Sequence, residues 1–474
     1  MKKSLLFLLS TLLIVPLASC GSTGTSSSPL SSSEESSIVS SSEELPVKKE
    51  VNAAVPSVFN SEGSEASFNA KATYDESYFL NDATTFMQGL AQLSYLAAVT
   101  CSIKESHEGL FNQMGFDNYY YSKSYDQGHK EDGYTVLLSH KKYKTFDLLS
   151  VVFFGMDYRE EWVSNFDVGT TGNHHGFDTC ATNALTEVKE YIDKNYKDVT
   201  LKYWVTGYSR GGALTGLFAS KIMENASYNA NEKNVYAYTF EAPANTLKTN
   251  IKNYKNIHNL VNSMDLVPNL FPSEYELVRE GIDYDIYSDN LNDYLAEEIP
   301  NFAYDMTFTP YPDEDPLYTD YASFVQFVVN QISKISTEGV SISTRELFDQ
   351  NLAPLAKDVV RFVLRNLTSD KLSTLVAAAK ELTMADIFMA ISSEENLNLL
   401  VLSLLEQAEI EISDEDNKIV ADLIHYVYTL LGDSEFMKVV VDAIARKSNY
   451  MNCVLAHLLE IPYVLVEHYQ ESLE

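Results

Sequence analysis

The sequence is poor in positive charge and in cysteine. Its 474 residues include 67 Asp and Glu but only 34 Lys and Arg, which gives a formal net charge of −33. This excess of negative charge argues against a nucleic-acid partner and against electrostatic docking on anionic lipid. The 4 cysteines show no Cys-x-x-Cys spacing, so we expect no metal site. We expect Cys101, Cys180 and Cys453 to be buried thiols, with one disulfide outside the cell as the alternative.

An apolar run at residues 5–18 follows a pair of lysines and is too short, with those flanks, to be a spanning helix. It ends in Leu-Ala-Ser-Cys, which resembles the bacterial lipobox, where cleavage exposes a cysteine that receives lipid. The resemblance implies a signal peptide at 1–19 and lipidation of Cys20. It also implies a lipoprotein anchored in the cell membrane, on the extracytoplasmic face of a bacterium. The alternative is a plain signal peptide with an incidental cysteine.

The next segment contains few residues that could form a core. Residues 21–46 are rich in Ser, Thr, Gly and Glu, and the chain is loop-like to about residue 66. We therefore expect a flexible tether at 20–66. About 400 residues remain, which is enough for one large domain with an insertion or for two domains.

Strand and helix patterns alternate from residue 67 to residue 283. This alternation predicts a largely parallel sheet with helices on both faces, an α/β fold. The predicted strands are 116–121, 134–140, 146–154, 199–205, 235–240 and 257–261, and the helices include 81–99 and 178–195.

Residues 284–460 have a different character. From about Phe324 to Leu459 helical patterns follow one another, with no good strand and no repeat of fixed period. We expect a helical insertion or cap that leaves the sheet and returns to a C-terminal segment at 461–474. The alternative is a separate helical domain with no part in catalysis.

The most informative motif is Gly-Tyr-Ser-Arg-Gly at 207–211, between an apolar strand and a helical pattern rich in small residues. A strand that turns sharply into a helix with serine at the apex is a nucleophile elbow. The turn requires glycine on both sides of Ser209, and the N–H of the next residue can help to bind an oxyanion. The alternative is an ordinary Gly-Ser turn.

A serine at an elbow needs a histidine base and a carboxylate that orients it, in the chain order Ser, Asp, His for an α/β-hydrolase. Asp265 directly follows the predicted strand 257–261. It could instead only cap the turn before Pro268. Three histidines come later, of which His425 and His457 lie in helical patterns. We predict His468 as the base, because it lies beyond Pro462 near the chain end, with His457 as the main rival.

Several segments resemble class 3 (fungal-lipase-like) lipases, over about residues 80–272 and the last dozen. Residues 207–214 resemble the family's Gly-His-Ser-Leu-Gly-Gly-Ala-Leu, and residues 151–156 its Phe-Arg-Gly-Thr strand end. Residues 161–168 and 174–177 are similar to its Asp-Trp-x-x-Asp-x-x-Val and His-x-Gly-Phe segments, with Glu161 and Asn165 in place of the two Asp. Residues 262–268 are similar to its Asn-x-x-Asp-x-Val-Pro, and residues 468–471 to its terminal histidine segment.

The resemblance implies an α/β-hydrolase fold and a serine esterase that cleaves acyl esters, with lipids the commonest substrates. It implies an oxyanion hole made by the N–H groups of Met156 and Arg210. No cofactor is required. The chain departs from the family at Phe154, Met156, Tyr208 and Arg210. The alternatives are a non-catalytic surface binding lipoprotein on a degenerate hydrolase fold, or a serine hydrolase of peptides, thioesters or carbohydrate esters.

Overall fold

The computed structural model describes residues 46–56, 67–127, 133–155, 160–271, 275–299, 302–432 with short gaps, 442 and 446–469. The signal peptide, Cys20 and Met156 lie outside these described residues. No helix in the described part of the chain is both long and apolar enough to cross a lipid bilayer.

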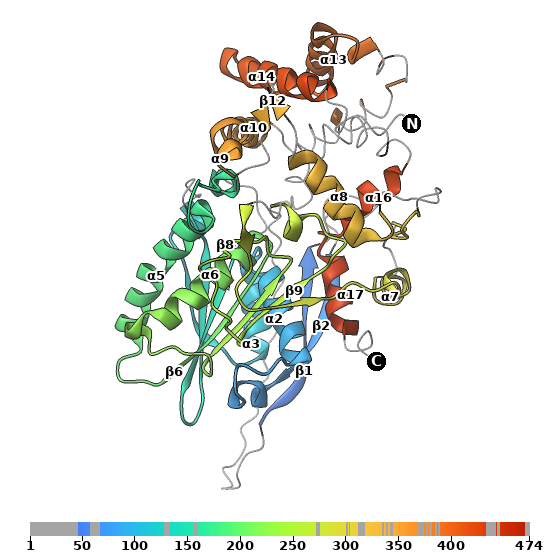
Figure 1. Ribbon diagram of the computed structural model, residues 1–474. Helices are drawn as coiled ribbons and strands as arrows, with labels where there is room; N and C mark the ends of the chain where they lie inside the picture. The colour runs from blue at the N-terminus through green and yellow to red at the C-terminus, as the bar shows by residue number, and fades with distance from the viewer. Residues whose placement is uncertain are drawn as a thin grey trace.

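A seven-stranded sheet forms the centre of the molecule (Figure 1). The strand order is β11-β9-β7-β6-β5-β4-β3. Neighbours from β11 to β5 pair in parallel, whereas β4 and β3 are antiparallel. The strands are β3 (Asp117–Tyr121), β4 (Val136–Lys142), β5 (Asp147–Phe153), β6 (Leu201–Tyr208), β7 (Val235–Phe240), β9 (Ile257–Val261) and β11 (Ile282–Asp285). The prediction of a mostly parallel α/β sheet is confirmed.

The central strands are buried on both faces, as their continuous apolar sequences require. In β6, Tyr203 and Val205 pack with one set of helices, and Trp204 packs on the opposite side. The first set is α5 (His175–Asn195) and α6 (Arg210–Glu224), and the second is α2 (Gln88–Thr100) and α3 (Lys104–Gln113). This arrangement fixes the carboxyl end of β6, where Ser209 lies.

The chain folds earlier than the sequence analysis predicted. β1 (Lys48–Pro56) pairs antiparallel with β2 (Ser67–Asp75), so the predicted tether at 20–66 is wrong for residues 48–56. Alternate residues of β1, including Val51 and Val55, are fully buried in the cluster that contains α2. This period of two is the ordinary signal of a strand with one face on the core.

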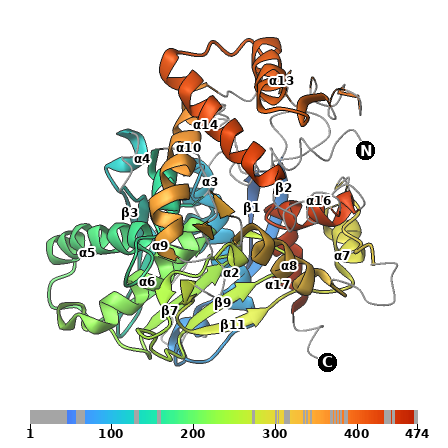
Figure 2. The same cartoon turned by 45° about the horizontal axis from the view of Figure 1, so that its top comes forward.

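The helices after the sheet form two groups. The inner helices are α7 (Leu291–Glu298), α8 (Tyr321–Ser333), α16 (Lys447–Leu455) and α17 (Glu460–His468), and their buried residues belong to the cluster on the α2 side of the sheet. The outer helices are α10 (Ala353–Asn366), α13 (Glu394–Gln407) and α14 (Asp414–Leu431), and most of their buried residues form a cluster of their own. In Figures 1 and 2 the inner helices lie beside the sheet, and α13 lies far from it.

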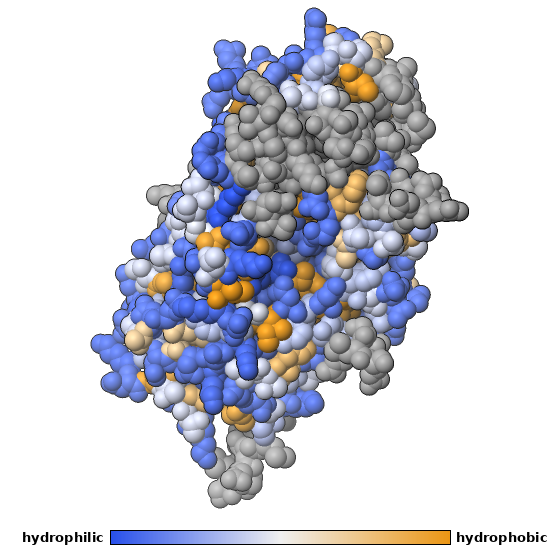
Figure 3. All heavy atoms as spheres, in the orientation of Figure 1, coloured by the Kyte–Doolittle hydropathy of each residue, from blue (hydrophilic) through white to orange (hydrophobic). Residues whose placement is uncertain are grey.

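The remaining elements are short. Two of them are strands that lie between residues 324 and 459, where only helices were expected. The expectation of an all-helical region is therefore wrong at these two strands. These elements are β12 (Ser336–Thr337), β13 (Val340–Ser341), β8 (Thr246–Leu247), β10 (Leu277–Val278), η2 (Glu76–Leu80), η3 (Glu160–Phe166), η4 (Ala226–Tyr228), η5 (Val267–Asn269), η7 (Phe348–Leu352), α4 (Ser124–Gln127) and α9 (Arg345–Leu347). On the face shown in Figure 3, hydrophilic residues predominate and apolar residues form small scattered groups.

Candidate active site

Ser209 lies at the turn between β6 and α6, as the motif predicts. Its φ of 55° and ψ of −125° place a residue other than glycine at positive φ, the strained geometry of a nucleophile elbow. The turn is held by the N–H of Ser209, which donates to the carbonyl of Phe240 at 2.8 Å. The elbow is therefore tied to the end of the neighbouring strand, β7.

The end of β5 closely approaches the elbow. A Cβ atom on Gly155 would lie 2.3 Å from the carbonyl oxygen of Tyr208 and 2.4 Å from the nitrogen of Gly211. A Cβ on Gly211 would lie 2.3 Å from the carbonyl oxygen of Phe153. Glycine is therefore required sterically at both positions. The close approach places Gly155, the residue before Met156, against the first turn of α6. Arg210 begins that helix, where N–H groups lack an intrahelical acceptor.

Two side chains complete a hydrogen-bonded chain with Ser209. The Ser209 hydroxyl donates to Nε2 of His457 over 2.8 Å, and Nδ1–H of His457 donates to Oδ2 of Asp265 over 2.6 Å. Asp265 is fully buried, and its Oδ1 accepts the N–H of Val267 at 2.8 Å. The geometry is that of a nucleophile, a base and an orienting carboxylate.

The prediction that His468 reaches Ser209 is wrong. His468 is the last residue of α17, where its ring stacks on Tyr294 with centroids 4.0 Å apart and planes 7° apart. The rival His457 occupies the position next to the serine. It was expected inside a helix, but α16 ends at Leu455 and α17 begins at Glu460, so His457 lies in the turn between them. Pro462 stands in the first turn of α17, where proline is tolerated, and thus marks a helix start.

Two buried tyrosines hold the turn that carries His457. The Tyr208 hydroxyl donates to the carbonyl of His457 at 2.6 Å, and the Tyr95 hydroxyl donates to the carbonyl of Leu459 at 2.5 Å. The rings of Tyr208 and His457 lie 5.0 Å apart between centroids. Burial, with the nearby Tyr95 and Asp265, raises the pKa of Tyr208 well above its ordinary value, so this hydroxyl remains a donor. Neither tyrosine was recognised as a site residue from the sequence.

The side chain of Arg210 points away from the reacting groups. It is 2 % exposed, and its guanidinium donates to Oδ1 of Asn165 at 2.6 Å, to the carbonyl of Gly133 at 3.1 Å and to Sγ of Cys180 at 3.2 Å. The guanidinium carbon also lies 5.6 Å from the centre of the Phe177 ring. Two of the chain's departures from the family, Arg210 and Asn165, therefore contact each other and hold the first turn of α6 in place.

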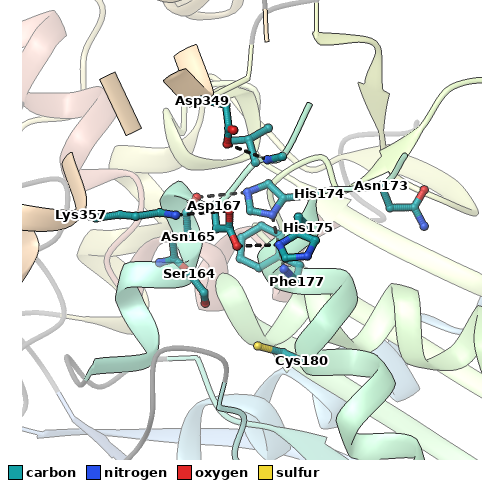
Figure 4. A network of polar contacts seen from close by, with 12 residues as sticks. Ser164, Asn165, Asp167, Asn173, His174, His175, Phe177, Cys180, Asp349 and Lys357 are labelled. Atoms are coloured by element: carbon teal, nitrogen blue, oxygen red, sulfur yellow. Dashed lines mark hydrogen bonds and ion pairs between the residues drawn. The ribbon is translucent and has the colours of Figure 1, made fainter. Parts of the chain in front are cut away.

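A polar network joins this region to the helices that follow the sheet (Figure 4). Oδ2 of Asp167 is hydrogen-bonded to Nδ1 of His175 at 2.6 Å, and Oδ1 forms an ion pair with Lys357 of α10 at 3.3 Å. Oδ1 of Asp349 accepts the N–H of Gly169 at 3.2 Å. The loop before α5 is thus tied to α10 and to the turn that precedes it.

Arg345 strengthens the same connection. Its guanidinium donates to the carbonyl oxygens of Val168 at 2.5 Å, Gly169 at 2.6 Å, Gly172 at 2.7 Å and Asn173 at 2.8 Å. The side chain is buried among these groups, and burial lowers its pKa, although a guanidinium stays charged in proteins. One cation therefore orders much of the loop at 168–173.

The three cysteines that were expected to be buried are free and buried in the structure. Cys453 lies next to the site, because its carbonyl accepts the N–H of Leu266 at 3.2 Å. Cys101 donates to the carbonyl of Ala98 at 2.9 Å, and Cys180 donates to that of Gly133 at 3.1 Å. Each is used as a small buried side chain.

A family model and several solved structures match parts of this chain. Residues 141–275 match the family described as Lipase (class 3), a segment that contains Ser209 and Asp265. The chain is also similar to solved structures of lipases. A fungal lipase–inhibitor complex is 18% identical with a TM-score of 0.35, over 44% of this chain and 83% of that one. The Rhizomucor miehei lipase–propeptide complex is 19% identical with a TM-score of 0.32, over 44% and 71%.

The lipase of Rhizopus microsporus var. chinensis is 18% identical with a TM-score of 0.32, over 42% of this chain and 74% of that one. No curated protein matched the sequence significantly. The family match begins in β4 and ends before the helices that supply His457, so the base comes from the part of the chain that the match does not cover. Residues 141–275 are therefore the part of this chain that is similar to class 3 lipases.

Proposed function

We propose that this protein hydrolyses acyl esters, with lipid esters as the substrate class, through Ser209, His457 and Asp265. The observation that carries the proposal is the continuous hydrogen-bonded chain from the elbow serine through His457 to a fully buried Asp265. The class 3 lipase match supports the choice of esters.

The reaction follows from the geometry. Ser209 attacks the ester carbonyl while Nε2 of His457 takes its proton, and Asp265 stabilises the imidazolium and holds its orientation. The tetrahedral intermediate collapses as His457 returns the proton to the leaving alcohol, and water then repeats the sequence on the acyl-enzyme. We assign the oxyanion to the N–H groups of Arg210 and Met156, each worth about 3 kcal/mol of barrier.

The decisive experiment is labelling with a serine-directed fluorophosphonate, together with hydrolysis of a short p-nitrophenyl ester. We expect labelling and turnover in the wild type and neither in Ser209→Ala. A folded wild type that is neither labelled nor active would identify a binding protein on a hydrolase fold, and labelling of Ser209→Ala would refute the assignment of the nucleophile.

We further propose that the helices between Asp265 and His457 set acyl selectivity. Trp162 and Val163 lie in η3, shortly after Met156 in the sequence, and pack in one cluster with Val360 of α10. An acyl chain needs an apolar wall that excludes water, and Ser209 is only 5 % exposed, so the site is already well covered.

This second proposal is tested with esters of increasing acyl length. We expect Val360→Asn to change the chain-length profile, whereas Val420→Asn, an equally buried change within the outer cluster, leaves it as in the wild type. Identical profiles for both folded variants would make these helices structural.

For localisation we propose a lipid anchor on Cys20, on the basis of the Leu-Ala-Ser-Cys sequence alone. The mature protein should then partition into detergent, and Cys20→Ala should release it or leave its signal uncleaved. An unchanged location of Cys20→Ala in the producing cell would refute the anchor.

A further inference from the structure

A second buried carboxyl group lies beside the orienting carboxylate. Glu241 directly follows β7, between the strand that leads to Ser209 and the strand that leads to Asp265. Its N–H donates to the carbonyl of Leu260 at 3.0 Å, and the residue before it accepts the N–H of Ser209. Its φ is 48°, which favours glycine, so the backbone alone gives no reason for a glutamate here.

The side chain of Glu241 is directed at the loop that carries Asp265. Its Oε2 accepts the N–H of Asn262 at 3.0 Å, and the carbonyl of Asn262 in turn accepts the N–H of Asp265 at 2.9 Å. Both residues are 0 % exposed. No N–H or O–H donor among the described residues satisfies Oε1 of Glu241, which is buried. A buried acceptor without a donor is unfavourable, whereas a protonated Oε1 would itself be a donor and could use the nearby carboxylate of Asp265 as its acceptor.

The two carboxyl groups cannot both be ionised at low cost. Asp265 is the member held as an anion, because its Oδ1 accepts the N–H of Val267 and its Oδ2 accepts Nδ1–H of His457. Burial, and then the negative charge of Asp265, raise the pKa of Glu241 well above its usual range. Apart from His457, the negative charge of Asp285 also raises the pKa of Glu241. The carboxyl groups in turn raise the pKa values of Tyr95, Tyr208 and Cys453, and none of these four groups is a cation.

We propose that Glu241 is a neutral carboxylic acid that positions Asp265, donating its Oε1 proton to the Asp265 carboxylate while Oε2 holds the N–H of Asn262. This inference rests on the proposed function for its kinetic consequences. Glu241 does not touch the substrate, and it acts through Asp265 on the orientation of His457. Two carboxyl groups share one proton here, but only one of them belongs to the Ser–His–Asp chain.

The arrangement has a consequence for pH dependence. While Glu241 is protonated, Asp265 keeps its place and a single negative charge faces the imidazole. When Glu241 loses its proton at alkaline pH, the donor is lost and two anions repel each other in a buried site. Turnover should therefore fall on the alkaline side with the ionisation of Glu241.

Three variants separate the carboxyl group from the backbone. Glu241→Gln keeps a donor and an acceptor but cannot ionise, and Glu241→Gly removes the side chain at a φ that glycine favours. Glu280→Gln is the matched control, because Glu280 is a buried carboxyl whose pKa burial also raises, but Asp265 is not among the groups that shift it.

We expect Glu241→Gly to lower kcat by about tenfold or more with little change in KM, as for a group that acts through the orienting carboxylate. Glu241→Gln should stay near the wild-type rate at neutral pH and lose the alkaline fall. Glu280→Gln should keep both the wild-type rate and the alkaline fall. If Glu241→Gly keeps the wild-type kcat and pH profile, or Glu241→Gln keeps the alkaline fall, the proposal is overturned.

A readout without turnover separates this inference from the proposed function. The Nδ1 proton of His457, shared with Asp265, should give a low-field proton resonance that His457→Ala removes. We expect Glu241→Gly to shift or broaden it and Glu241→Gln to retain it. If the wild type proves inactive, the proposed function falls, and this resonance still decides on Glu241. An identical resonance in the wild type and Glu241→Gly would refute the positioning role.

Discussion

The inner and outer helices come from one continuous stretch of chain, but they are built differently. Phe324 of α8 is 1 % exposed in the same cluster as Trp204 of the sheet, whereas Ile424 of α14 is 2 % exposed in a cluster confined to the outer part of the chain. The inner helices also lead into the turn that carries His457. The extent of burial is therefore similar in the inner and outer helices. The two groups differ in the hydrophobic cluster in which their side chains are buried.

This difference shows that one part of a long insertion can contribute to an active site while another part lies away from it. The inner helices extend the core of the sheet, and they return the chain to the elbow with the base in place. The outer helices meet the core through α10 and through the charged contacts of Lys357, Asp349 and Arg345. The inner helices should affect catalysis directly, and the outer ones should affect it mainly through the loop at 168–173.

The largest effect is expected from His457. His457→Ala should lower kcat/KM for a short ester by on the order of 10⁴-fold, because the serine loses its base. His468→Ala on the inner helix α17 and His425→Ala on the outer helix α14 should stay within a few-fold of the wild type. Steady-state kinetics on folded variants provides the measurement. A large loss of activity in His468→Ala with an active His457→Ala would reverse the assignment made here.

We expect acidic pH to lower the stability of the hydrolase core. Burial lowers the pKa of His107 and His174 to about 3 and that of His258 to about 4, against about 6.5 when unfolded. Because the unfolded chain binds these protons first, the free energy of unfolding should fall as the pH drops below about 6.5, by at most about 1.4 kcal/mol per pH unit for each histidine. Urea titrations at pH 7 and pH 5 measure it.

The control for the acid effect is His107→Leu. His107 stacks on Phe111 with ring centroids 4.3 Å apart, so a hydrophobic side chain can occupy its place. This variant should lose less stability than the wild type between pH 7 and pH 5. An equal loss in both proteins would show that His107 does not bind a proton on unfolding in this range.

Equal truncations in the two groups of helices should give unequal results. Phe324→Ala removes a ring that packs edge-on against Tyr450 of α16, at 4.7 Å between centroids, and should cost about 3–5 kcal/mol and lower kcat as well. Ile424→Ala should cost about 2–5 kcal/mol within the outer cluster but leave kcat for a short ester nearly unchanged. Hydrogen exchange should localise each change. A similar loss of kcat in both variants would contradict the distinction.

The smallest expected effect concerns Arg345. Arg345→Ala leaves the buried carbonyl of Val168 and the partly buried carbonyls of Gly169 and Gly172 without this donor. It should lower stability by about 1–3 kcal/mol, with faster hydrogen exchange at 168–173. Arg361→Ala, which removes an exposed ion pair with Asp358 on α10, should change stability by less than about 1 kcal/mol. If hydrogen exchange at 168–173 is unchanged in Arg345→Ala, Arg345 does not order this loop and does not link the core to the outer helices.

The sheet could be predicted from the sequence because its strands have a strong local signal. The strands at 235–240 and 257–261 occur at the predicted residues, since both are apolar and bounded by polar turns. The elbow at Ser209 was also predictable from a local signal, because close backbone contacts require glycine at fixed positions around the serine. β1 was missed because its alternating pattern follows a long Ser-rich segment that hid the change in character.

The base could not be assigned from the sequence alone. The stretch around His457 is apolar at helical spacing, and only tertiary contacts, such as the Tyr208 hydroxyl on the His457 carbonyl, show that it is a turn. Pro462 was interpreted as the end of a helical region, whereas it lies at the start of α17. Glu241 was detectable in principle, because a glutamate follows a buried strand directly, but its neighbour Asp265 is brought to it only by the pairing of β7 with β9.

The contact between Ser209 and His457 spans 248 positions of the chain, and that between His457 and Asp265 spans 192. During synthesis the nucleophile and the carboxylate emerge long before the base, so the growing polypeptide contains an elbow with no means of removing its proton. Closing so long a loop is entropically costly and slow. A product truncated before residue 457 would therefore lack the imidazole that accepts the hydroxyl proton of Ser209.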